Sequence, residues 1–121
     1  MSKTISEILR AADELRPNAF APERKTDWLS RLEGQIQMQI FLQDGAETVS
    51  YTWPEDRDTQ VLVQPPYDRL YELFLAAMID YAQGEPGQYA ASIAVFNGLM
   101  GEFARFFADR YRPADGHAGA C

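Results

Sequence analysis

"VLVQPPYDRLYELFLAAMIDYAQGEPGQYAASIAVFNGLM" spans Val61 to Met100 and decides the fold of the chain. Its apolar residues recur at helical spacing on both sides of Gly84, which predicts two helices joined by a short connection. In the first helix one stripe holds Leu70, Leu73, Phe74, Ala77 and Tyr81, while Tyr71, Leu75, Met78 and Ile79 spread over other sides. A helix that is apolar on several sides is expected to be covered by more than one neighbour.

The second of these helices is expected to follow the tight connection at Glu85-Pro86-Gly87 and to stop at Pro113. The short connection predicts an antiparallel helical hairpin. Small residues that allow close helix approach recur along it, at Ala90, Ala94, Gly98, Gly101 and Ala104.

Two more helices are predicted upstream. Thr4-Ile5-Ser6-Glu7 fits a capping box, and the helix that it opens should end before Pro17. Pro22 suits the first position of the next helix, which is expected to run to about Leu42. Gly34 lies inside it at a cost of roughly 1 kcal/mol relative to alanine, so either another backbone packs closely there or the helix bends, and close packing is the commoner reason.

The segment between the second and third helices is patterned differently. Val49, Tyr51 and Trp53 alternate with polar residues, and a second β-rich run follows at 60–64. This predicts a short β-hairpin or extended arm at about 44–65, which is marginal in water unless it leans on something else. The prediction is therefore a mainly all-α fold: one four-helix domain over 1–113 with this arm, and a disordered tail at 114–121.

Composition limits the classes of function. The 121 residues suffice for one domain with one core. Lys plus Arg total 11 against 18 for Asp plus Glu, and the net charge of −7 disfavours a general attraction to nucleic acid or anionic lipid. Cys121 is the single cysteine, and no apolar run approaches the ~20 residues of a membrane span. We expect a soluble protein of a reducing, cytoplasmic origin with no membrane partner.

Residues for chemistry are sparse. His117 and Cys121 both lie in the predicted tail. The acidic turn at 55–58 lacks the ligand count and the glycine of a calcium loop. Asp80 and Asn97 lie near apolar stripes and are interpreted as structural hydrogen-bonding groups, in a possible buried pair. The sequence predicts no catalytic, cofactor-binding or metal-binding residues, no cofactor, and a fold that chelators leave intact.

Three stretches carry a family resemblance: "KTDWLSRLEGQI" from Lys25, "PYDRLYELFLAAMIDYAQGE" from Pro66 and "YAASIAVFNGLMGEFARFFADRYRP" from Tyr89. Over most of the chain, from Thr4 to about Pro113, it resembles the small head-to-tail connector (adaptor) proteins of tailed bacteriophages and prophages. Its most telling parts are Trp28-Leu29, Pro66-Tyr67-Asp68, Ile79-Asp80-Tyr81 and Phe96-Asn97.

The resemblance implies a helical, non-enzymatic structural protein that forms a homo-oligomeric ring below the portal protein. Such a ring extends the DNA channel, contacts tail-completion proteins and lets DNA pass without tight binding. The expected location is the head-tail junction of the virion, after assembly in the bacterial cytoplasm.

Candidate contacts with a neighbour or partner are Val49, Tyr51 and Trp53 on the arm and Tyr71, Leu75 and Met78 on the third helix. Two alternatives stay open: the third helix is the central helix of a monomer, and Trp53 folds back onto the chain's own helices. A different function also stays open, that of an acidic helical interaction protein of the DNA-mimic or inhibitor type. Arginines interspersed among the carboxylates argue against it.

Overall fold

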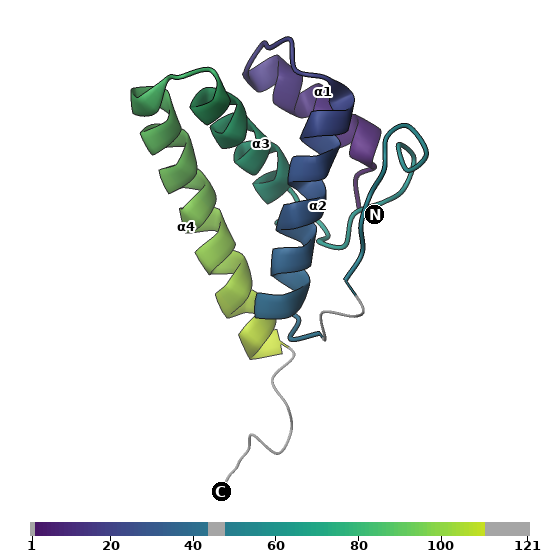
Figure 1. Ribbon diagram of the computed structural model, residues 1–121. Coiled ribbons are helices and arrows are strands. Elements are labelled where there is room, and N and C mark those ends of the chain that lie inside the picture. Colours follow the sequence, from purple (N-terminus) through teal and green to yellow (C-terminus); the bar gives the residue numbers. More distant parts are fainter. Residues whose placement is uncertain (1, 44–47, 111–121) are drawn as a thin grey trace, which may run out of the picture.

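The computed structural model describes residues 2–43 and 48–110 of the chain. These residues form four α-helices and no strand (Figure 1): α1 (Ile5–Leu15), α2 (Pro22–Gln39), α3 (Arg69–Ala82) and α4 (Pro86–Arg110). The predicted all-α fold is confirmed. The predicted tail at 114–121, with His117 and Cys121, lies outside the described residues.

Local signals set most helix ends where the sequence predicts them. The Thr4 hydroxyl accepts from the Glu7 amide (3.2 Å), and the Glu7 carboxylate accepts from the Thr4 amide (2.8 Å), which completes the capping box. Pro22 is the first residue of α2, and Gly84, with φ of 74°, follows the end of α3. α2 ends at Gln39, short of the expected Leu42.

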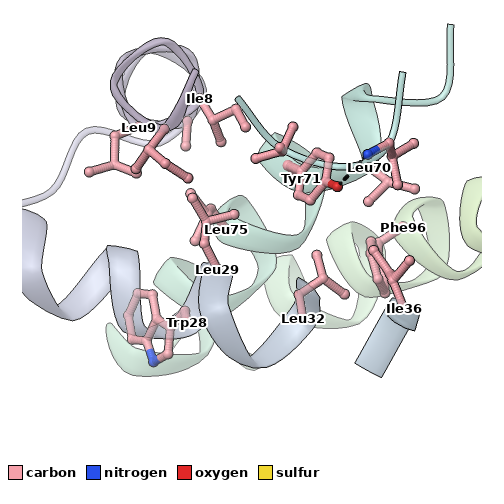
Figure 2. Close-up of a cluster of buried hydrophobic side chains, with 14 of the residues drawn as sticks. Ile8, Leu9, Trp28, Leu29, Leu32, Ile36, Leu70, Tyr71, Leu75 and Phe96 are labelled. Atoms are coloured by element: carbon pink, nitrogen blue, oxygen red, sulfur yellow. Dashed lines mark hydrogen bonds between the residues drawn. The ribbon is translucent and has the colours of Figure 1, made fainter. Parts of the chain in front are cut away.

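The helix α3 lies at the centre of the fold. The helices α1, α2 and α4 all pack against it, and α4 runs back along it as the predicted antiparallel hairpin (Figure 1). Its fully or nearly fully buried apolar residues are Leu70, Tyr71, Leu75, Ala76, Ala77 and Ile79. Figure 2 shows Ile8 and Leu9 of α1, Leu29 and Leu32 of α2, and Phe96 of α4 gathered around Tyr71 and Leu75. The chain's own helices therefore cover the apolar residues on most sides of α3, while Tyr81 at its end is 66% exposed.

The predicted β-hairpin is wrong, because the two runs of the arm do not pair with each other. Residues 57–61 instead run beside the N-terminal segment, where the Ile5 amide donates to Thr59 O (3.0 Å) and the Val61 amide to Lys3 O (3.0 Å). A single antiparallel bridge joins Thr4 and Gln60.

The other run of the arm is held by side chains of α2. The Tyr51 amide donates to Ser30 Oγ (2.7 Å), and the Val49 amide donates to Gln37 Oε1 (2.7 Å). Backbone N–H groups need hydrogen-bond acceptors wherever water is excluded. Here oxygen atoms of polar side chains on α2 are the acceptors, in place of the backbone carbonyls of a neighbouring strand. The arm is thus an extended segment wrapped on the helices.

The expected close backbone approach at Gly34 is also wrong. Apart from its two chain neighbours and the nearby backbone of α2 itself, no atom of the described residues lies within 4 Å of the position that a Cβ at Gly34 would occupy. Gly34 therefore lowers the stability of α2 through its backbone entropy, and closer packing within the chain does not offset this loss.

Gly34→Ala is expected to raise the free energy of unfolding by about 0.5–1 kcal/mol, because alanine loses less backbone entropy in a helix and meets no obstacle there. Chemical denaturation followed by circular dichroism measures the change. Gly84→Ala is the matched control and should lower stability by about 1–2 kcal/mol, because an L-residue is strained at φ of 74°. A loss of stability in Gly34→Ala would contradict the open space beside α2.

Candidate interaction surface

Glu33 organises a buried polar cluster that joins the arm to α2 and α3. Its carboxylate is 0% exposed and accepts hydrogen bonds from Tyr71 OH (2.6 Å), Tyr51 OH (2.7 Å) and the Leu62 amide (2.9 Å). Burial raises the pKa of Glu33 above its ordinary value, an effect that these hydrogen bonds partly oppose. Burial and the nearby Glu33 charge also raise the pKa of both tyrosines, which stay protonated as donors.

The residues predicted to contact a partner do not form one surface. Tyr71 and Leu75 are 0% exposed and Tyr51 is 8% exposed, so these three lie in the core and offer almost no surface to another chain. Val49, Trp53 and Met78 are half-buried and pack against that core.

For these last three residues, contact with a partner stays a prediction. Trp53 packs on the chain's own helices, as the alternative interpretation had it, and borders a shallow cleft with Phe20 and Lys25.

Asp80 and Asn97 do not form the suggested pair. Asp80 is fully buried and accepts from Arg16 Nε (2.9 and 3.2 Å) and from Ser92 Oγ (2.6 Å), whereas Asn97 is exposed on α4. Arg16 Nη2 also donates to Ser92 Oγ (3.1 Å). These hydrogen bonds connect Arg16, which follows α1, to both α3 and α4, so the role of Asp80 is structural.

An aromatic groove opens where the end of α2, the segment before α3 and the last turns of α4 meet. It has a volume of about 500 Å³, and its aromatic lining consists of Phe41, Tyr67, Phe103, Phe106 and Phe107. The rings support one another, with centroids 4.7 Å apart for Phe41 and Phe107 and 5.1 Å apart for Tyr67 and Phe106. Figure 1 shows the ends of α2 and α4 approaching each other at this end of the molecule.

The lining of the groove carries no charge, and Pro65 and Pro66 form part of its wall. The Arg110 guanidinium lies 5.6 Å from the centroid of the Phe106 ring, at the rim. Sequence reasoning missed this groove because its walls come from three separate segments. The available signal was the aromatic cluster at 103–107 together with the uncharged run at 59–67.

Two exposed helical surfaces also lack charge. Residues 86–101 contain no Asp, Glu, Lys or Arg, although charged residues make up 24% of the chain. The residues of this stretch that α4 exposes include Ala90, Ala91, Ala94, Val95 and Gly98. The small residues expected to bring helices together thus largely face away from α3, and Gly98 has open space beside it.

The second uncharged surface lies at the end of α2. Residues 34–43 carry no charge, and Met38 and Leu42 within them are 54% and 80% exposed. Charged residues are depleted at the centres of protein interfaces, whereas an ordinary solvated helix face carries them.

Within residues 2–43 and 48–110, no three His, Cys, Asp or Glu side chains gather where they could hold a metal ion. The helices of the same residues include none that is long and apolar enough to span a bilayer.

Comparison of the chain with protein-family models, curated proteins and solved structures found no match. What the protein does is therefore inferred from its own surfaces.

Proposed function

We propose that this chain is a non-enzymatic subunit of a phage or prophage head-to-tail connector, which forms a ring below the portal and extends the DNA channel. The observation that carries the proposal is the exposed, uncharged side of α4 within residues 86–101. A monomer with a net charge of −7 has no evident need for such a face, whereas a subunit packed against neighbours does.

The family resemblance supports the same proposal. The three stretches that carry the resemblance include most of α2, all of α3 and nearly all of α4, and Pro66-Tyr67 belongs to the wall of the aromatic groove. The resemblance thus extends to residues that border a candidate interaction surface as well as to the core.

The charge of the chain suits a channel. Acidic subunits around a DNA duplex adhere weakly to its phosphates, so a net charge of −7 favours passage over retention. The proposed place of action is the head-tail junction of the virion, with the portal and tail-completion proteins as partners.

The test is co-purification of the chain with the portal protein that the proposal requires the same phage or prophage genome to encode. Wild type is expected to co-purify with the portal, and Val95→Glu to lose at least tenfold of that binding, because it places a charge on the uncharged face of α4 at a side chain that is 58% exposed. Ala108→Glu is the matched control on the same helix, beside Asp109, and should bind like wild type. Retention of a nucleic-acid-binding enzyme in place of the portal would favour the DNA-mimic alternative.

A further inference from the structure

We infer that Leu42 of one copy of this chain is seated in the aromatic groove of a neighbouring copy. The contact deepens the proposed function, and it rests on that function only for closure of the contacts into a ring. It uses two surfaces of one end of the subunit, each present in a single chain.

Leu42 combines a highly exposed side chain with a backbone conformation that is rare for leucine. Its side chain is 80% exposed, and its backbone has φ of 58°, a left-handed conformation that favours glycine. The turn is fixed, because the Gln43 amide donates to Gln37 O (2.8 Å) and Gln37 Nε2 donates to Gln43 Oε1 (2.7 Å). A leucine at this position costs backbone strain and exposes apolar surface, and the monomer gains no packing in return.

The groove is a suitable receptor for such a side chain. Its volume of about 500 Å³ falls within the roughly 300–1,000 Å³ typical of binding pockets. Its rings already pack on one another in the single chain, so little ordering is needed when a side chain enters. Leu42 is not among the residues that line the groove of its own chain.

Charge favours a second copy as the occupant. Two chains of net charge −7 repel each other, and close approach is least opposed where neither surface carries a charge. Residues 34–43, which present Leu42, and the groove wall at 62–67 are both uncharged. Phe41 lines the groove while its neighbour Leu42 points into solvent, so donor and receptor are separate surfaces of one chain. The contact builds a ring where each copy donates Leu42 to one neighbour and receives Leu42 from the other.

The first experiment compares purified full-length variants by sedimentation velocity at concentrations up to on the order of 1 mM. Wild type is expected to associate with rising concentration, and Leu42→Gly and Phe106→Gln to associate at least tenfold more weakly. Leu42→Gly should melt at the same or a higher temperature, because glycine adopts φ of 58° without strain, so unfolding cannot explain its loss of association. Ala21→Gln is the control, since Ala21 is exposed at the N-cap of α2, the opposite end of that helix from the groove.

The second experiment mixes Leu42→Gly with Phe106→Gln. Each variant keeps one of the two surfaces, so the mixture should form 1:1 dimers and nothing larger. A mixture that stays monomeric, a wild type that is monomeric throughout, or a Leu42→Gly variant that associates like wild type overturns the contact. Portal co-purification separates the two proposals: a wild type that binds the portal but whose self-association does not depend on Leu42 removes this contact alone, whereas a wild type that does not bind the portal removes the proposed function.

Discussion

Glu33→Ala is expected to lower the free energy of unfolding by about 3–5 kcal/mol. The substitution leaves the Tyr51 hydroxyl, the Tyr71 hydroxyl and the Leu62 amide without the acceptor that each uses in the fold. An unsatisfied buried donor costs about 1–3 kcal/mol, and three of them surround this one carboxylate. Urea denaturation followed by circular dichroism at neutral pH measures the loss.

Two controls separate the cluster from general effects of removing an acid. Glu23→Ala removes an exposed carboxylate from the first turn of the same helix and should change stability by no more than about 0.5 kcal/mol. Glu33→Gln keeps the side-chain shape but cannot titrate. A Glu33→Ala protein as stable as Glu23→Ala would show that the cluster contributes little.

The pH dependence of stability gives the sign of the Glu33 effect. Burial raises the pKa of Glu33 above its ordinary value of 4.5, so the folded state binds this proton more tightly than the unfolded state does. The stability that the proton confers is complete below pH 4.5 and is lost as pH rises through the folded-state pKa. Relative to Glu33→Gln, wild type should therefore lose stability across that window, and a gain would contradict the raised pKa.

Leu75→Ala is expected to cost about 2–5 kcal/mol of stability, because Leu75 is 0% exposed at the centre of the core (Figure 2). The deletion leaves a cavity where α3 meets the other helices. Thermal and urea unfolding of the purified chain measure it, with Val95→Ala as the exposed apolar control, which should stay within about 0.5 kcal/mol of wild type. If Leu75 instead served only as an assembly contact, the monomer would keep its stability while oligomers were lost.

The helices could be read from the sequence because their ends depend on neighbours in the chain. The capping box at Thr4, the first-turn proline at Pro22 and the left-handed Gly84 are each defined within a few residues. The end of α2 at Gln39 was harder, since it depends on a leucine adopting a conformation that is uncommon for its residue type.

The arm and the groove could not be read in the same way. The alternation of Val49, Tyr51 and Trp53 has the period of a strand. The amides of Val49 and Tyr51, however, donate to side chains 12 and 21 residues upstream, and no local signal reports these partners. The groove likewise joins segments around residues 41, 65 and 105. The uncharged runs were visible in the sequence, whereas which of their side chains are exposed depends on the packing of α3 and α4.

The central position of α3 has a consequence for synthesis of the protein on the ribosome. The helices α1 and α2 leave the ribosome first, yet both pack on a helix that begins only at Arg69. The N-terminal segment likewise waits for its backbone partners at 57–61. Contacts between distant parts of a chain form only after the intervening segment has been made, and exposed apolar surface favours aggregation in the meantime. The nascent chain therefore carries uncovered faces of α1 and α2 until α3 has been made, and chaperone contact during that interval would protect them.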